Sequence, residues 1–224
     1  MIARSRIAAA LGAALTFGAA GGVALAAGTV TPPAGTPNLA AMVVQSADLA
    51  PGAVAAQQGY VTPPKNFSAQ YDAGFTSAAT SDGVSYYSIS DEVAIAPSAA
   101  TVGDFVGLET QLLRTKAGHK LLDRVIIKVA GRKAHLKAKD IKYRALGSVG
   151  VGQTSFLETI GVASRHVSVH EDVVLFQEGT VYGSVTLTAK PGEQIPQSDA
   201  TALASAMDAH VDANVGATGA TGTT

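Results

Sequence analysis

The sequence predicts an α+β fold in which a mostly antiparallel sheet packs against helices. Three observations carry this prediction. Stretches rich in Val, Ile, Tyr and Thr lie between turn residues, as is typical of strands. Apolar residues at helical spacing follow these stretches twice, near the middle and the end of the chain. Of the 224 residues, 47% are apolar and 15% are charged, which suffices for one folded core.

The N-terminus, residues 1–27, is expected to be a signal peptide. A basic start with Arg4 and Arg6 precedes a long uncharged run that ends in small residues. The alternative is an uncleaved membrane anchor, because the run has about the length that spans a bilayer. Its Ala and Gly content favours cleavage after Ala26 or Ala27, since these residue types insert weakly. The secreted chain would have no transmembrane segment, and its 14 basic and 17 acidic residues would give a formal charge of −3.

The rest of the chain divides by composition. Residues 28–39 are expected to be a Pro/Gly-rich linker, 40–215 a single α+β domain and 216–224 a disordered tail. The sequence contains no Cys, which excludes disulfides, thiolate nucleophiles, Cys-ligated metal centres and lipidation of the chain.

In the first half of the domain, strands come first. Short apolar runs at 42–44 and up to Val61 precede two strand-like stretches, 67–76 and 83–95. A turn dipeptide, Asp82-Gly83, separates these stretches and predicts a hairpin.

Two helical segments follow these strands. Ser98 or Thr101 is expected to cap the first helix. The second helix carries an apolar stripe over 121–129, and Gly118 would separate the two helices. The β-branched run at 125–127 leaves a strand open as the alternative.

The second half repeats this order, although residue identities between the halves are too sparse to demonstrate a duplication. Strands are expected at 141–146, 155–162, 165–177 and 180–188. The last two would form a hairpin that turns at Glu178-Gly179. Ser198-Asp199 would cap a final Ala-rich helix.

Two motifs invite a functional interpretation that their context disfavours. The glycine-rich run 147–152 is expected to be a turn, because a strand and not a helix follows it and no Gly-Lys-Ser/Thr occurs. If this segment were a helix, His166 and His170 would share one face and could hold a metal ion. The alternating Val and Ser residues around them instead indicate a strand, on which the two histidines lie about 13 Å apart. They would then face solvent beside Ser168 and Asp172, so we expect no metal, cofactor or catalytic residue.

Charge is concentrated in one segment, 114–144. This segment holds two acidic residues and eleven of the fourteen basic residues that follow the leader. Its formal charge is therefore +9, whereas the rest of the chain after the leader has a formal charge of −12. Such asymmetry can build a local positive potential in an acidic protein. The candidate anion-binding residues are Lys116, Lys120, Arg124, Lys128, Arg132, Lys133 and Lys137. The alternative is an ordinary solvated helix face.

The positive charge of this segment predicts anionic partners, namely cell-envelope polymers, lipid head groups or an acidic protein. Nucleic acid is disfavoured by the export signal and by the lack of aromatic side chains near the segment other than Tyr143.

Two stretches carry a resemblance to known proteins. One runs from 142–144 through 150–153 into a strand, and the other is 173–181 followed by the capped Ala-rich helix. Together they resemble secreted proteins of unassigned function from high-GC actinobacteria. More distantly, they are similar to the extracytoplasmic sensor domains of actinobacterial Ser/Thr kinases and to PsbP-like small lipoproteins. Those sensor domains usually carry disulfides and those lipoproteins a lipidated Cys, and this chain has neither.

The resemblance implies an α+β domain that binds something outside the cytoplasm, and it transfers no catalytic residue. We therefore expect a secreted binding or sensor-like module without catalytic activity. The alternatives are a secreted hydrolase with a dispersed catalytic site and a cell-wall-associated structural protein.

Overall fold

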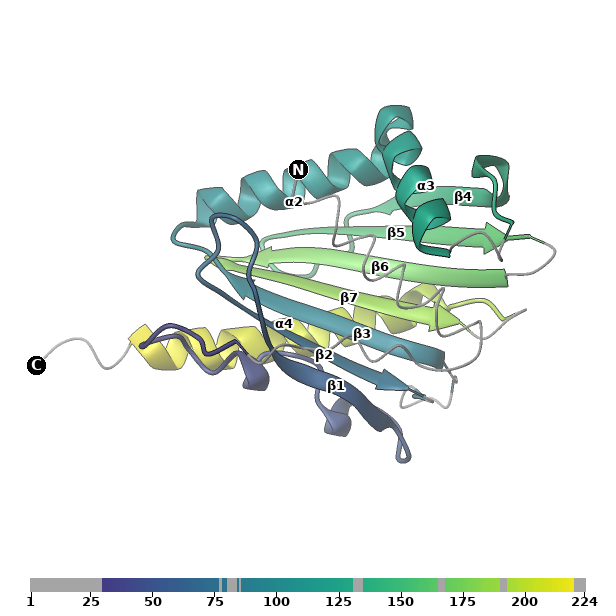
Figure 1. Cartoon of the computed structure of the whole chain (residues 1–224). Coiled ribbons are helices and arrows are strands. Elements are labelled where there is room, and N and C mark those ends of the chain that lie inside the picture. The colour runs from purple at the N-terminus through teal and green to yellow at the C-terminus, as the bar shows by residue number, and fades with distance from the viewer. Residues whose placement is uncertain are drawn as a thin grey trace, which may run out of the picture.

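The computed structural model describes residues 30–76, 78–79, 84, 86–130, 135–164, 168–189 and 193–219 (Figure 1). The predicted signal peptide, the Asp82-Gly83 turn and His166 lie outside the described residues. In chain order, the elements are η2 (Leu39–Ala41), η3 (Ser46–Asp48), β1 (Val54–Val61), β2 (Ala69–Thr76), β3 (Tyr86–Ile95), α2 (Ala99–Arg114), α3 (Lys116–Ala130), η5 (Ala138–Asp140), β4 (Ile141–Gly147), β5 (Thr154–Ala163), β6 (Ser168–Glu178), β7 (Val181–Ala189) and α4 (Gln197–Gly219).

The seven strands found among the described residues form one sheet, in the order β1-β2-β3-β7-β6-β5-β4. Every neighbouring pair is antiparallel. The strands β1 to β3 progress from one edge to the centre, β4 to β7 do the same from the other edge, and helices follow each set (Figure 1). The predicted α+β class with a mostly antiparallel sheet is confirmed.

The sheet has a hydrophobic core on each face. On one face, called the α2 face here, side chains such as Ile160 and Leu175 pack under Val106 of α2 and Ile126 of α3. On the opposite face, called the α4 face, strand residues pack with α4 and with the segment that precedes β1. Side chains alternate between the faces along each strand, so a strand covered on both sides, such as β6, is buried along almost its whole length, its polar residues included.

The predicted helices α2 and α3 are both present. Ser98 is the N-cap of α2, and its Oγ accepts a hydrogen bond from the Thr101 amide at 3.2 Å. The run 125–127 lies within α3, so it does not form the alternative strand. Ile126 is fully buried there, because tertiary packing of an apolar stripe outweighs the low helix propensity of β-branched residues.

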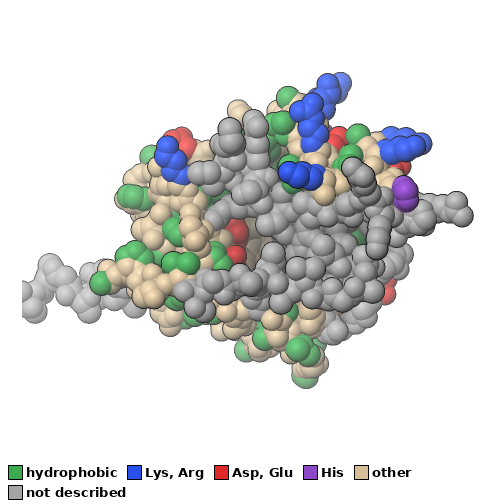
Figure 2. Space-filling model, in the orientation of Figure 1, with side chains coloured by type: hydrophobic (Ala, Val, Ile, Leu, Met, Phe, Trp, Pro, Cys, Tyr) green, Lys and Arg blue, Asp and Glu red, His purple; other side chains and the backbone are tan. Residues whose placement is uncertain are grey.

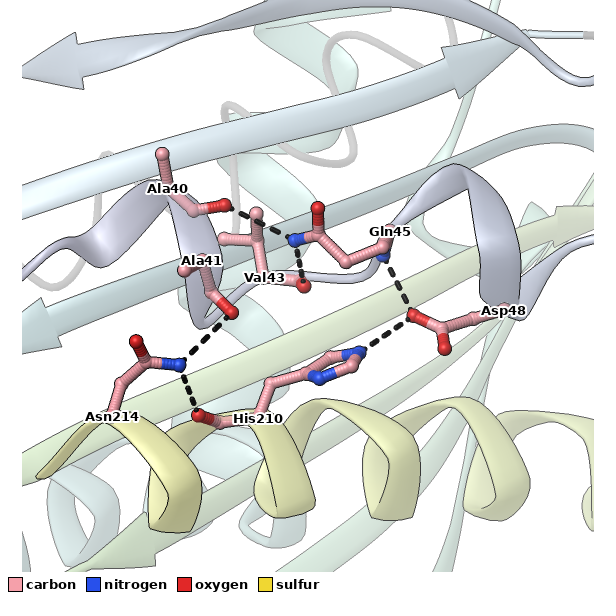
Figure 3. A network of polar contacts seen from close by, with 7 residues as sticks. All are labelled: Ala40, Ala41, Val43, Gln45, Asp48, His210 and Asn214. Atoms are coloured by element: carbon pink, nitrogen blue, oxygen red, sulfur yellow. Dashed lines mark hydrogen bonds and ion pairs between the residues drawn. The ribbon is translucent and has the colours of Figure 1, made fainter. Parts of the chain in front are cut away.

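The segment before β1 is tied to α4 by polar contacts (Figure 3). The His210 Nε2 of α4 lies 3.0 Å from the Asp48 Oδ2. The same carboxylate oxygen accepts a hydrogen bond from the Gln45 amide at 2.7 Å. The Asn214 side chain donates to the Ala41 carbonyl at 3.4 Å. These contacts fix the segment against the helix on the α4 face.

The apolar run 42–44 lies outside the strands, and its side chains are buried in the α4-face core beside η2. Two local predictions were wrong in detail. Asp199 is not a cap but lies in the first turn of α4, where it is 4% exposed and accepts a hydrogen bond from the Tyr86 hydroxyl. The helix also continues to Gly219, four residues beyond the predicted end of the domain.

Candidate functional sites

The candidate anion-binding residues lie mainly on α3. Its four basic side chains are exposed and recur at every fourth position, which places them on one side of the helix. Lys137, just before η5, is also exposed. We call these five residues the basic surface: Lys116, Lys120, Arg124, Lys128 and Lys137. Arg132 and Lys133 lie outside the described residues. Figure 2 shows Lys and Arg side chains projecting from this part of the molecule.

No carboxylate offsets these charges within the described part of the chain. The ion pairs found there all involve His and none involves Lys or Arg. The nearby Asp123 is engaged differently, because its Oδ1 accepts a hydrogen bond from the Tyr143 hydroxyl at 3.0 Å. Like charges four residues apart on a helix repel by a few tenths of a kcal/mol per pair. The basic surface is therefore a row of uncompensated positive charge.

Under the basic surface, His119 connects α3 to the sheet. Its ring stacks on that of Tyr143 with a centroid distance of 4.1 Å and an interplanar angle of 10°. Its Nε2 contacts the Leu113 carbonyl and lies 3.8 Å from the Glu158 Oε1. Burial, together with the Asp123 carboxylate, raises the pKa of Tyr143, so this phenol stays protonated and donates. These contacts anchor α3 with its basic residues facing outward.

Glu158 is an unusual member of this cluster. Its side chain is fully buried, and neither carboxyl oxygen has a hydrogen-bond partner. Burial raises the pKa of Glu158 to about 8, although the nearby Arg114 acts in the opposite direction. At neutral pH the carboxyl is therefore mostly protonated.

The sheet has the opposite charge character. Six of its strands, all except β4, contain seven carboxylates and no Lys or Arg. The strand register places four of the seven on the α2 face: Asp72, Glu92, Glu158 and Glu171. The molecule thus separates a basic helix from an acidic sheet.

A further acidic group was not anticipated from the sequence. The carboxylate oxygens of Glu178, Asp208 and Asp212 lie within 4.8 Å of one another. Burial and the neighbouring carboxylates raise the pKa of both Glu178 and Asp208. The Gly152 amide donates to Asp208 at 2.9 Å. Glu178 lies at the β6–β7 turn, and the two aspartates lie on α4 about 30 residues later in the sequence. No local sequence motif therefore predicts this group.

The two motifs discounted in the sequence have the expected backbone. His170 lies on the strand β6, so the helical spacing that a two-histidine metal site needs is not formed. Its Nε2 is 3.6 Å from Asp172, which is 2% exposed rather than solvent-facing as predicted. Burial raises the pKa of Asp172, and the Thr159 hydroxyl donates to it at 2.7 Å. The glycine-rich run 147–152 is a turn followed by the strand β5.

Comparison with known proteins gives one structural similarity. No family model matches the sequence, and no curated protein is similar to it in sequence. Among solved structures, the extracellular domain of PknH from Mycobacterium tuberculosis aligns with a TM-score of 0.39 and 12% identity. The alignment covers 66% of this chain and 66% of that one, just under two thirds of each. No helix in the described part of the chain is long and apolar enough to cross a membrane. Functional conclusions therefore depend on the residues themselves.

Proposed function

We propose that this protein is an extracytoplasmic, non-catalytic binding module that attaches to an anionic polymer through the basic surface. The observation that carries the proposal is the row of exposed cations on α3 without carboxylate partners among the described residues. Successive charges four residues apart are about 6 Å apart along the helix axis. Such a row suits a partner with repeated negative charges better than it suits a single small anion.

The packing of α3 supports a binding role. The Tyr143 stack and the Leu113 contact of His119 fix the helix on the sheet, so the four cations do not have to be ordered by the partner. A preformed array loses less conformational entropy on binding than a flexible basic tail. The acidic remainder of the molecule would orient the protein with α3 toward the polymer.

Reversing one charge of the basic surface is expected to weaken binding without unfolding the protein. Lys120→Glu should elute from immobilised inorganic polyphosphate at lower salt than the wild type, and the triple variant K116E/K120E/K128E should bind about tenfold more weakly or worse. The matched control is Lys65→Glu, which changes an exposed lysine in the β1–β2 connection. Equal elution of K120E and K65E, or wild-type retention that is independent of salt, would refute the proposal.

Export is the second part of the proposal, and it is motivated by the leader sequence. The protein recovered from culture supernatant is expected to begin at Ala27 or Gly28, after cleavage behind Ala26 or Ala27. N-terminal sequencing measures this directly. Recovery of intact Met1 from the membrane fraction would instead support an anchored protein.

A further inference from the structure

The carboxyl group of Glu158 lies in the sheet next to α3, and neither of its oxygens accepts a hydrogen bond from the described part of the chain. Its cross-strand neighbours are Ala145 on β4 and Val173 on β6, whose side chains have no donor. Buried polar atoms in native proteins are nearly always satisfied, so an isolated buried carboxyl calls for an explanation. Because the fold holds it by no hydrogen bond, this carboxyl can gain or lose a proton without breaking one.

Two basic side chains face Glu158. The nearer is His119 of α3, whose Nε2 lies 3.8 Å from the Glu158 Oε1. The other is Arg114, the last residue of α2, whose positive charge favours the ionised carboxyl. An imidazole can exchange a proton near neutral pH, whereas a guanidinium group stays protonated. Glu158 and His119 therefore form a titrating pair, which carries a charge of −1 without protons, 0 with one proton and +1 with two.

The other titratable groups around Glu158 do not respond in the neutral pH range as a counter-charge. Tyr143 faces it from β4, but this phenol stays protonated and donates to Asp123 of α3. On β6, Glu171 lies diagonally across the strand pair, and burial raises its pKa to about 8, so it is mostly neutral at pH 7. Ionisation of Glu158 therefore adds a negative charge beneath α3.

The Glu158–His119 pair lies close to the basic surface. On α3, His119 follows Lys116 by three positions and directly precedes Lys120. Helical residues three positions apart have Cβ atoms about 5–6 Å apart, so the carboxyl lies on the order of 12 Å from these ammonium groups. This separation is near the Debye length of about 10 Å at 0.1 M salt, and part of the path runs through protein, where screening is weaker. One unit of charge at this distance alters the affinity of an anion on the surface roughly threefold.

We propose that the Glu158–His119 pair is a proton switch for the basic surface, so that the anionic polymer binds more tightly to the protonated pair and draws a proton into it from solvent. The inference rests on the proposed function, because it concerns the same surface and the same polymer. The two effects are inseparable, because a proton that strengthens polymer binding must itself be bound more tightly when the polymer is present.

The switch is expected to operate between pH 7 and pH 9. Burial raises the pKa of Glu158 to about 8, so its carboxyl is mostly neutral below this range and negatively charged above it. Unperturbed lysine side chains lose their charge only near pH 10.4. A fall in polymer affinity between pH 7 and pH 9 would therefore come from the pair and not from the basic surface itself.

Titration calorimetry of the purified protein with long-chain inorganic polyphosphate tests the proposal. Wild-type affinity is expected to fall about threefold between pH 7 and pH 9, and Glu158→Gln should remove this fall. In buffers of different ionisation enthalpy at pH 8, the wild type should take up about a quarter of a proton more than Glu158→Gln on binding. The terminal phosphates of the polymer titrate alike with both proteins, so the difference between them reports Glu158.

The matched control is Asp91→Asn. Asp91 is also a buried carboxyl whose pKa burial raises, but the strand register places it on the α4 face, on the opposite side of the sheet from α3. Its replacement should leave the pH dependence and the proton uptake of the wild type in place. Equal pH dependence of the wild type and Glu158→Gln, or loss of the effect in Asp91→Asn, would overturn the proposal.

A measurement without polymer tests the coupling directly. Carbon-13 NMR can follow the Glu158 carboxyl, which is assigned by the loss of its signal in Glu158→Gln. In K116E/K120E/K128E the pKa of Glu158 should rise by about half a pH unit or more, the equivalent of threefold, whereas Lys65→Glu should leave it unchanged. An unchanged pKa in the triple variant would overturn the inference. Absence of polymer binding at every pH would overturn it together with the proposed function, and binding without the proton uptake that depends on Glu158 would overturn this inference alone.

Discussion

Gly118→Ala is expected to destabilise the protein by about 3 kcal/mol or more and to displace α3. A Cβ at position 118 would lie 2.1 Å from the Leu112 carbonyl oxygen and 2.5 Å from the Leu112 Cα. These are backbone atoms of the last turns of α2, so they cannot be moved aside as a flexible side chain can. Overpacking of this kind in well-packed interiors costs roughly 1–3 kcal/mol, and a backbone clash lies at or above the upper end.

The matched control is Gly107→Ala, in the middle of α2. No atom lies within 4 Å of the Cβ that this change adds. Replacing an exposed helical glycine with alanine stabilises a helix by about 0.5–1 kcal/mol. Urea unfolding followed by circular dichroism should therefore move the midpoint in opposite directions for the two variants. A Gly118→Ala protein as stable as the wild type would mean that α2 and α3 do not approach as closely as described.

Glu171→Gln is expected to be more stable than the wild type at alkaline pH and somewhat less stable than it near pH 5. In the folded protein the Glu171 carboxyl keeps its proton up to a pKa of about 8, whereas in the unfolded chain it ionises near 4.5. Between these values only the unfolded state gains the charge, so wild-type stability falls as pH rises. At about 1.4 kcal/mol per pH unit, the loss has a ceiling of about 5 kcal/mol. The buried Gln amide lacks hydrogen-bond partners at every pH, which costs about 2 kcal/mol, so the net gain in stability at pH 9 is about 3 kcal/mol.

Denaturant unfolding of the wild type and of Glu171→Gln between pH 5 and pH 9 measures this difference. The free-energy gap should widen steadily with pH and level off above pH 8, while the m-value stays constant. Glu193→Gln, at an exposed position, should show no such widening. A gap that does not depend on pH would show that Glu171 is not held in its protonated form.

The elements that were predicted well are those specified by local signals. The β6–β7 hairpin turns at Gly179, whose positive φ of 55° suits glycine, and Ser98 caps α2 as its position before an apolar helical pattern suggested. Predictions were wrong where burial decided the outcome. Asp199 has the sequence of a cap but is held inside by Tyr86, 113 residues away in the sequence. Such contacts leave no trace in the neighbouring residues.

The same distinction applies to the candidate sites. The basic surface could be predicted because its residues repeat every four positions within one helix. The acidic group of Glu178, Asp208 and Asp212 could not, because the fold brings the β6–β7 turn and α4 together from positions about 30 residues apart in the sequence. In the sequence, each of these acids is indistinguishable from an ordinary surface residue.

The pairing at the centre of the sheet has a consequence for biogenesis. The strand β3 has no central neighbour until β7 has been synthesised, and the contact between Asp48 and His210 spans 162 residues. During synthesis, the first three strands would therefore remain without the partner that buries them until the end of the chain emerges. Under the proposed export, the chain would therefore remain unfolded while it passes through a translocation channel, and it would complete its fold only after the last helix has crossed the membrane.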